Sequence, residues 1–395
     1  MEENVTNDHL AGEQSYPGLR KRVRALCETF PMTYWRECDE RRAYPHEFVA
    51  ALTESGLLAA LIPKDYGGLG LTLVEASTIL EEINRSGGNA AACHAQMYVM
   101  GALVRHGSPA QHVRWLPRLA SGELRLQAFS VTEHESGSDT SAMQTLAVRD
   151  GDDFIVNGHK NWTSRAAETD LVLLLARTSR VETVSRRSDG LSLFLVDLTD
   201  ARSQQAVEIT PVRTMMNYAT YQIAYRNLRV PAENLIGAEG QGFRHALDGM
   251  NAERILLASE AIGDGYWFVE QSAARAAART VFGRPIGANQ GVQFPIARAY
   301  AAVRAADEMR TLAARRYDSG DSCGAEANMA KLLASEASWQ AANACLDTFG
   351  GYGFVADYDV ERKFRETRLY QVAPVSNNLV LAHLAHTVLG MPKSY

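Results

Sequence analysis

Five short blocks of the chain combine glycines with hydroxyl, aromatic or cationic side chains, which are residue types that hold ligands. The blocks are FSVTEHESGSD at 129–139, GHKNWTS at 158–164, VPAENLIGAEGQGF at 230–243, RTVFGRPI at 279–286 with Gln290, and FGGYGF at 349–354. Glycine lets a ligand approach the backbone closely, arginine makes forked contacts with anions, and tryptophan offers a wall for a flat ring. Each block alone is a weak signal, but these residue types would suit a ligand that carries a flat ring and anionic groups.

Metal and disulfide chemistry have little support in the sequence. The five cysteines stand at positions 27, 38, 93, 323 and 345, in no CxxC spacing and in an odd number. Cys93 and His94 are neighbours and are not four residues apart, as metal ligands on one helix face would be. We therefore expect no metal site, no disulfide framework and a reducing compartment.

In their order and over nearly the whole chain, the five blocks resemble those of the acyl-CoA dehydrogenase family of flavoproteins. The first resembles the motif that opens the family's middle β-domain, and the second resembles the strand whose aromatic residue lies beside the flavin. The third resembles the crossover into the C-terminal helical bundle. The resemblance implies FAD as cofactor, an acyl-CoA substrate, and a homotetramer built as a dimer of dimers.

The resemblance also implies which residues hold FAD. It places at the cofactor Phe129, Val131, Thr132, Gly137, Ser138, Trp162, Thr163, Ser164, Arg279, Phe282, Gln290, Phe349, Gly350, Gly351, Ser376 and Asn378. The flavin ring needs an aromatic wall, for which Trp162 is suited, and hydroxyls near its nitrogens, for which Thr132, Thr163 and Ser164 are suited. The pyrophosphate would meet Arg279 and the glycine pair across a subunit interface.

The family's reaction needs a carboxylate in a dry pocket to remove the α-proton of the acyl group. Many members carry this glutamate near the C-terminus, where the present chain has Pro374. Isovaleryl-CoA and long-chain acyl-CoA dehydrogenases carry it on a helix about 120 residues earlier, and Glu253 falls on that position. Glu253 is the predicted catalytic base, and the alternative is a structural helix glutamate paired with Arg254 or another cation.

Pro374 affects a second part of the site. In relatives the backbone N–H at this position helps to bind the thioester oxygen, and proline has no N–H. The loss of one such donor costs roughly 2.7–4 kcal/mol. Either a neighbour such as the Ser376 hydroxyl substitutes, or the loop is shifted, or the chemistry differs.

Four further residues are predicted to contact the substrate, and Arg165 has more than one interpretation. Ser138, Arg254, His94 and Tyr98 are the predicted substrate contacts, although His94 and Tyr98 also suit an ordinary packed helix. Arg165 follows Ser164, where relatives place a small or amide residue. It suits contact with an acidic acyl group or tuning of the flavin's charge, but an ion pair with Glu168 or Asp170 is the favoured expectation.

Helical and strand patterns supply the elements that would position these residues. We expect an α+β multidomain protein with a disordered N-terminus at 1–15, a helical domain at 16–125, a β-barrel or sandwich domain at 126–235, and a C-terminal four-helix bundle at 236–395. The bundle helices are predicted at 241–275, 287–318, 325–349 and 375–389. Short apolar runs at Phe154, Leu171 and Leu191 between turn residues predict strands.

The bulk properties agree with a soluble enzyme. The chain has 395 residues, 46% of them hydrophobic, and a net charge of −6. A nucleic-acid binder would show a basic excess, and no stretch approaches the roughly 20 apolar residues that span a bilayer. The acidic, polar N-terminus has no signal core. We expect a cytoplasmic protein with neither nucleic-acid nor membrane partners.

The sequence therefore predicts an FAD-dependent acyl-CoA dehydrogenase that forms a trans-2-enoyl-CoA and passes its electrons to an electron-transfer flavoprotein. Two alternatives stay open. One is a flavin oxidase or monooxygenase of the same fold, which Pro374 and Arg165 allow. The other is a flavin-binding scaffold with little catalysis. No motif reveals the acyl group.

Overall fold

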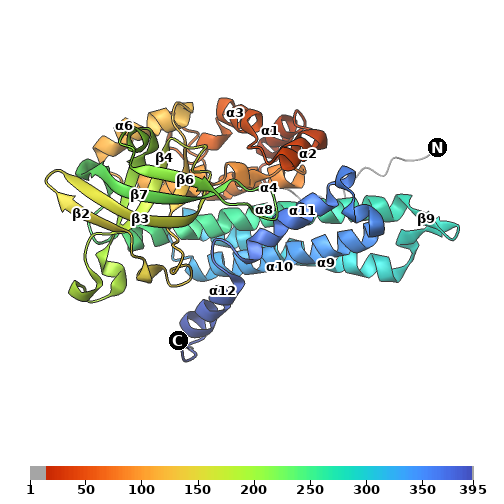
Figure 1. The fold of residues 1–395 in the computed structure, drawn as a ribbon. Helices are drawn as coiled ribbons and strands as arrows, with labels where there is room; N and C mark the ends of the chain where they lie inside the picture. The colour runs from red at the N-terminus through yellow and green to blue at the C-terminus, as the bar shows by residue number, and fades with distance from the viewer. Residues whose placement is uncertain (1–14, 394–395) are drawn as a thin grey trace.

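The computed structural model describes residues 15–393. Most of the predicted disordered N-terminus, residues 1–14, lies outside the described residues. Figure 1 shows a helical N-terminal region and a β-sheet region side by side, with long C-terminal helices running beneath both. This arrangement confirms the predicted order of a helical, a β and a second helical region.

The N-terminal region consists of amphipathic helices whose apolar faces meet in one core. Helix α4 illustrates the cause: Leu73, Ala76, Leu80 and Ile83 recur at helical spacing and are all buried. Thr72 and Glu75 form a capping box at its start. The helices are α1 (Pro17–Cys27), α2 (Met32–Arg41), α3 (His46–Glu54), α4 (Leu73–Arg85), α5 (Ala95–His106) and α6 (Pro109–Ser121).

The middle region is a branched sheet that folds over on itself. Its strands are β1 (Leu126–Ser130), β2 (Leu146–Asp150), β3 (Asp153–Ser164), β4 (Leu171–Arg177), β5 (Leu191–Asp197), β6 (Val207–Pro211), β7 (Thr220–Pro231) and β8 (Leu235–Ile236), and α7 (Leu198–Ser203) follows β5. The half β6-β7-β3-β2 joins the half with β4, β5, β8 and β1 at the single pair Leu146–Arg177. Phe154, Phe194 and Tyr225 from both halves share one core, as in the predicted barrel or sandwich.

The C-terminal region is dominated by three long helices. They are α8 (Gly242–Ala278), α9 (Gln290–Asp318) and α10 (Gly324–Phe349), and the short hairpin β9 (Thr280–Val281) and β10 (Arg284–Pro285) connects the first two. Helix α8 packs against α9, α10 and α4. A Cβ at Gly263 would lie 2.3 Å from the Glu81 carbonyl oxygen, so this glycine permits the close contact between α8 and α4.

The end of the chain differs from the predicted fourth bundle helix. A short helix, α11 (Val360–Thr367), was not predicted, and the expected helix at 375–389 is α12 (Asn377–His383) with a π-helical turn at Leu384–Val388. Figure 1 shows α12 projecting away from the long helices. Within the described chain the bundle therefore has three long members, and the fourth stands apart.

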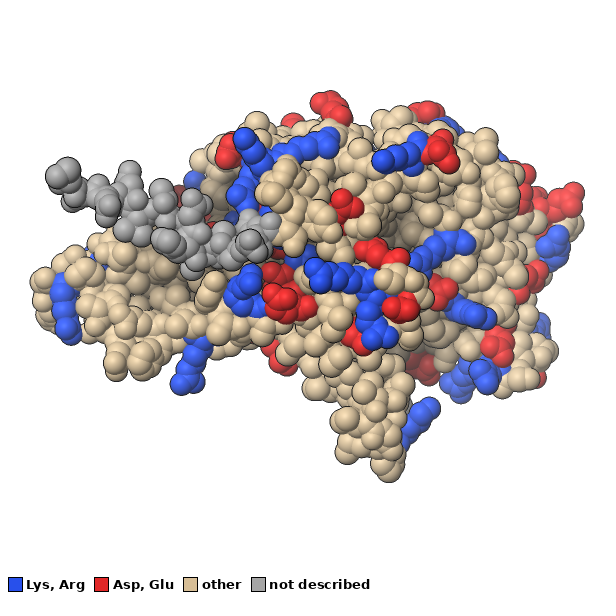
Figure 2. Space-filling view, turned by 180° about the vertical axis from the view of Figure 1, so that it is seen from behind, with Lys and Arg blue, Asp and Glu red and all other residues tan. Residues whose placement is uncertain are grey.

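The surface is uneven in charge. Figure 2 shows lysine, arginine, aspartate and glutamate side chains spread over the body, whereas the end of the long helices and the projecting C-terminal segment carry few of them. The hairpin end exposes Val281, Phe282 and Phe294, and the C-terminal segment exposes Leu389 and Met391. Apolar side chains thus reach the surface at these two extremities.

Candidate active site

Trp162 lies where strand β3 breaks its regular pairing. The register of β3 against β7 shifts between Lys160 and Thr163, and Trp162 takes a positive φ of 60°. Its side chain is 58% exposed, which is unusual for so large an aromatic residue. Strained conformations of this kind cluster at functional sites. The bulge leaves the indole exposed, and an exposed indole is suited to form a wall for a flat ligand.

The hydroxyls beside Trp162 face different ways. Ser164 is half-buried, and its Oγ lies 3.5 Å from Thr220 Oγ1. Thr163 is fully buried, and its Oγ1 lies 3.2 Å from Ser130 Oγ inside the sheet. Thr132 is half-buried, and its carbonyl accepts from the Asn161 N–H at 2.8 Å. The predicted contact of the Thr163 hydroxyl with the ring therefore does not fit this inward orientation.

The other predicted cofactor residues near the sheet lie on its rim. Phe129 and Val131 are half-buried, and Gly137 and Ser138 are exposed in the turn after β1. A Cβ at Gly137 would meet nothing within 4 Å, so the backbone of this turn is open to a ligand. The rim of the sheet therefore offers a ligand the backbone of Gly137 and the hydroxyl of Ser138.

Six further predicted cofactor residues lie at the far end of α8. Arg279 caps the C-terminus of that helix, Phe282 is fully exposed at φ 51°, and Gln290 begins α9. Phe349 ends α10, and Gly350 follows with φ 58° and ψ −134°, a conformation that glycine alone adopts readily. Gly351 is exposed beside it. Figure 1 shows the hairpin of this group far from the sheet, so one chain does not bring the two groups together.

Glu253 is a buried carboxylate on α8 with 8% of its surface exposed. Burial raises its pKa from 4.5 to about 7, while a hydrogen bond from Tyr98 and the charges of Arg254 and Arg165 oppose the rise. Glu253 forms no ion pair with any residue between 15 and 393. A carboxyl group with these properties is suited to accept a proton near neutral pH.

The alternative that Arg254 pairs with Glu253 does not hold. Arg254 Nη2 donates to Asn251 Oδ1 at 2.9 Å, and Arg254 Nε is buried without a partner among the described residues. Arg254 is half-buried, and burial lowers its pKa. It therefore lies beside the carboxylate as a cation with unused hydrogen-bonding capacity.

Helix α5 brings His94 and Tyr98 against this part of α8. Tyr98 hydrogen-bonds Glu253, and its pKa is raised well above 10 by burial and by the carboxylate. His94 Nδ1 lies 2.6 Å from Glu260 Oε1, and both side chains are buried. Glu260 also accepts from the Tyr370 hydroxyl at 3.3 Å. The sequence did not reveal Glu260, because its partner is 166 residues away.

The loop at Pro374 is held by a lysine that the sequence analysis missed. Lys331 on α10 is buried, and its Nζ donates to the Val375 carbonyl at 2.6 Å and to Asn377 Oδ1 at 2.8 Å. Burial and the nearby Arg254 lower its pKa to about 8. Ser376 Oγ accepts from the Leu379 N–H at 3.3 Å and so caps α12, while Asn378 is exposed in its first turn. The loop therefore carries the Ser376 hydroxyl, and the buried Lys331 ammonium contacts it from α10.

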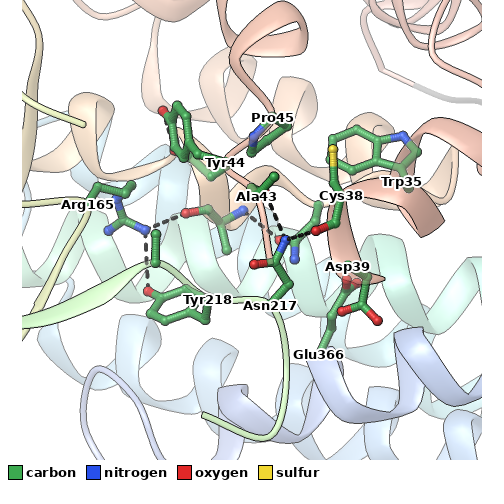
Figure 3. Close-up of a pocket in the computed structure, with 14 residues that line it drawn as sticks. Trp35, Cys38, Asp39, Ala43, Tyr44, Pro45, Arg165, Asn217, Tyr218 and Glu366 are labelled. Carbon is green, nitrogen blue, oxygen red and sulfur yellow. Dashed lines mark hydrogen bonds between the residues drawn. The ribbon is translucent and has the colours of Figure 1, made fainter. Parts of the chain in front are cut away.

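The favoured expectation for Arg165 was wrong. Glu168 accepts from the Tyr221 hydroxyl at 2.6 Å, and Asp170 Oδ2 accepts from the Arg125 backbone N–H at 2.8 Å. Arg165 is 3% exposed and contacts neither carboxylate. Figure 3 shows it on the wall of a cavity, with hydrogen bonds to Tyr218 and to a backbone carbonyl.

Replacement of Tyr98 by phenylalanine is expected to raise the pKa of Glu253, because the hydrogen bond that favours the ionised carboxylate is lost. With Glu253 as the predicted base, the midpoint of the pH dependence of flavin reduction should follow this pKa and move up by about one unit. Rapid-mixing reduction between pH 6 and 9 measures this. Tyr266→Phe, which removes a buried hydroxyl that donates to Asp307 on α9, should leave the midpoint unchanged. A reduction rate that stays low at pH 9 would contradict the explanation.

Two kinds of site are not found in the part of the chain that the structure describes. No group of three or more histidine, cysteine, aspartate or glutamate side chains there is placed to hold a metal ion. No helix within residues 15–393 has the length and apolar character needed to cross a bilayer. The five cysteines, all of which are described, are free.

Family comparisons agree with this geometry. The N-terminal, middle and C-terminal domains described for acyl-CoA dehydrogenases match residues 15–123, 128–228 and 240–389. The chain belongs to the acyl-CoA dehydrogenase family. It is accordingly an oxidoreductase with the fold of that family.

Individual acyl-CoA dehydrogenases are similar over most of their length. The chain is 32% identical over 396 residues to the acyl-CoA dehydrogenase fadE12 of Mycobacterium bovis, covering 99% of this chain and 100% of that one. It is 34% identical over 355 residues to (2S)-methylsuccinyl-CoA dehydrogenase of Cereibacter sphaeroides, covering 86% and 62%. A glutaryl-CoA dehydrogenase in complex with glutaryl-CoA superimposes with a TM-score of 0.88 at 28% identity, covering 100% and 98%.

Proposed function

We propose that this acyl-CoA dehydrogenase oxidises the Cα–Cβ bond of an acyl-CoA to a trans-2-enoyl-CoA, with Glu253 as the base. The observation that carries the proposal is the buried Glu253 carboxylate, whose pKa is near 7 and which has no cation paired with it among the described residues. Its oxygen accepts the proton from Cα, and the electron pair of that bond forms the new double bond. FAD, when bound, supplies the acceptor for the hydride that leaves Cβ.

The exposed side chains support FAD as the cofactor. The outward face of Trp162 suits the flat ring, and the open turn at Gly137 and Ser138 allows close approach of the backbone. Arg279 and the Gly350–Gly351 backbone suit a pyrophosphate. These residues would hold the cofactor from two sides.

The separation of the two groups supports assembly from several copies. Helix α8 has 37 residues and is therefore roughly 55 Å long at 1.5 Å per residue. A cofactor that touches Trp162 in one chain is expected to meet Arg279 of a second copy. The apolar side chains exposed at the hairpin, Val281, Phe282 and Phe294, suit such an interface. We therefore propose a homotetramer arranged as a dimer of dimers.

The thioester would lie between the Glu253 side chain and the loop at Pro374. The Ser376 hydroxyl is the proposed donor to its carbonyl oxygen, and the buried Lys331 ammonium adds positive charge to the same loop. Ser138 and Arg254 are proposed to contact the CoA thioester, and His94 and Tyr98 to border the acyl chain. An electron-transfer flavoprotein is the proposed acceptor of the electrons.

An anaerobic titration of the purified flavoprotein with a panel of acyl-CoA thioesters tests the proposal. Bleaching of the oxidised flavin band, together with the enoyl-CoA as product, is the expected result. Retained FAD with no bleaching by any thioester would instead indicate a scaffold. Rapid reoxidation by oxygen with formation of peroxide or a C4a adduct would indicate the oxidase or monooxygenase alternative.

A further inference from the structure

Arg165 differs from the other buried arginines in having spare hydrogen-bonding capacity and no carboxylate partner. Arg20, Arg310 and Arg362 each contact two carboxylates. Arg177 bonds only backbone carbonyls, but its Nε, Nη1 and Nη2 atoms are all used. Burial of a cation without a counterion is costly. An anionic ligand that pairs with the buried guanidinium would offset this cost in free energy.

The contacts of Arg165 leave one end of its guanidinium free. Nε donates to the Gln127 carbonyl at 3.1 Å, and Nη1 donates to the Ala91 carbonyl and to the Tyr218 hydroxyl, which lies 3.4 Å away. Nη2 has no hydrogen-bond partner among the described residues. The buried Gln127 side chain also keeps its Nε2 donor unpaired. Two hydrogen-bond donors, Arg165 Nη2 and Gln127 Nε2, are therefore left without an acceptor among the described residues.

A cavity of ≈ 30 Å³ adjoins this group. It lies between the N-terminal helices and the β6–β7 loop, and Figure 3 shows Arg165, Tyr44, Tyr218 and Asn217 around it. The volume corresponds to about two or three water-sized groups, which is the size of a carboxylate.

The two acids that border the cavity are paired elsewhere. Asp39 lies 2.7 Å from Arg365, and Glu366 lies 3.0 Å from Arg362. Neither carboxylate is therefore available to neutralise Arg165. The charge at this wall of the cavity is consequently positive.

Arg165 also acts on the residues at the base. Its charge favours the ionised forms of Glu253 and Tyr98, which hydrogen-bond each other. The Ala91 carbonyl that it holds stands just before helix α5, which carries Tyr98. The guanidinium therefore lies close enough to the proposed proton acceptor to interact with it electrostatically.

We propose that Arg165 binds a carboxylate at the end of the acyl chain remote from the thioester, and that the substrates are CoA thioesters of short dicarboxylic acids. This inference rests on the proposed function of the site around Glu253. A carboxylate completes the free side of the guanidinium with a charge-assisted hydrogen bond. An uncharged chain of the same length leaves the cation unpaired.

The test compares matched thioesters in the FAD-containing enzyme. Succinyl-, glutaryl- and adipyl-CoA are each paired with the monocarboxylic thioester of equal carbon number, namely butanoyl-, pentanoyl- and hexanoyl-CoA. The parent enzyme is expected to favour one dicarboxylic member in kcat/KM. Arg165→Met should lower the ratio of kcat/KM for that member to kcat/KM for its partner by about 10- to 100-fold, whereas a loss shared by both substrates reflects the effect of the Arg165 charge on Glu253. Arg165→Lys should recover part of the preference.

Arg177→Met is the matched control, because it also removes a buried arginine that bonds backbone carbonyls. In Arg177→Met the ratio of kcat/KM for the dicarboxylic thioester to kcat/KM for its monocarboxylic partner should equal that of the parent. Equal losses for both substrates in Arg165→Met, or a parent preference for uncharged chains, would overturn the inference while leaving the dehydrogenase proposal intact.

Calorimetric titration with the same thioesters provides a reading independent of turnover. Tighter binding of the dicarboxylic member by the parent, lost in Arg165→Met, supports the inference. Equal affinity of the parent for both members refutes it. If no thioester reduces the flavin, the proposed dehydrogenation itself fails, and this outcome is separate from the binding result.

Discussion

Glu253→Gln should lose at least about a thousandfold in the rate of flavin reduction, because the amide cannot accept the α-proton. Glutamine has nearly the shape of the carboxyl group, so FAD should remain bound and the absorbance spectrum of the oxidised flavin should be preserved. Rapid mixing with acyl-CoA under anaerobic conditions measures the loss. Substantial reduction by this variant would assign the base to another residue.

The same substitution has a consequence for stability that turnover does not report. Burial raises the pKa of Glu253 from 4.5 to about 7. The folded state therefore binds its proton more tightly than the unfolded state, and stability falls as the pH rises through 7. Glu253→Gln lacks this titration, so its Tm should exceed that of the parent at pH 8, with the difference vanishing toward pH 5.

Glu270→Gln is the matched control for the rate of flavin reduction. Glu270 lies on the same helix and forms an ion pair with Arg85 at 2.6 Å, away from the proposed base. Its rate of flavin reduction should stay within about threefold of the parent, as expected for a substitution outside the site. A large loss in this variant would mean that any glutamate-to-glutamine substitution on α8 impairs the enzyme. The loss in Glu253→Gln would then not identify Glu253 as the base.

Lys363→Met should lower the free energy of unfolding by about 3–5 kcal/mol, because it leaves a buried carboxylate without its cation. Lys363 Nζ lies 2.5 Å from Asp264 Oδ1, and both side chains are fully buried. The ammonium also donates to the Gly88 carbonyl at 2.8 Å and so ties α11 to the N-terminal region. Denaturant unfolding monitored by circular dichroism measures the change.

Arg41→Met is the control for this second effect. Arg41 lies 3.9 Å from Glu37 on the exposed face of α2, and surface pairs of this kind contribute about 0–1 kcal/mol. Its midpoint of unfolding should match that of the parent. Similar losses in the two variants would show that the removal of any cation destabilises this protein, irrespective of burial.

Patterns that repeat along the chain allowed the fold to be predicted. The long helices and the strands at Phe154, Leu171 and Leu191 follow from apolar periodicity and turn residues, and β3, β4 and β5 confirm those strands. The end of the chain was less predictable, because α11 is short and α12 projects from the bundle. Short helices take their position mainly from tertiary contacts.

The site was predictable only where side chains lie near one another in sequence or within a recognisable motif. The environment of Arg165 was missed because strand alternation fails at this point, where Trp162 and Arg165 both adopt positive φ values. Two neighbouring acids that suggested an ion pair consequently point elsewhere. The pairing of His94 with Glu260 joins distant segments, and no local pattern encodes such a contact.

The unbroken length of α8 has a consequence for the way such a chain can change in evolution. Glu253 lies in its first half, and Arg279 lies directly after its last residue. One residue inserted or deleted between them would rotate one end against the other by about 100° and shift it by about 1.5 Å. The proposed proton acceptor and the proposed phosphate-binding arginine would then no longer be correctly oriented relative to each other. Insertions and deletions should therefore be confined to the loops, while this segment varies by substitution alone.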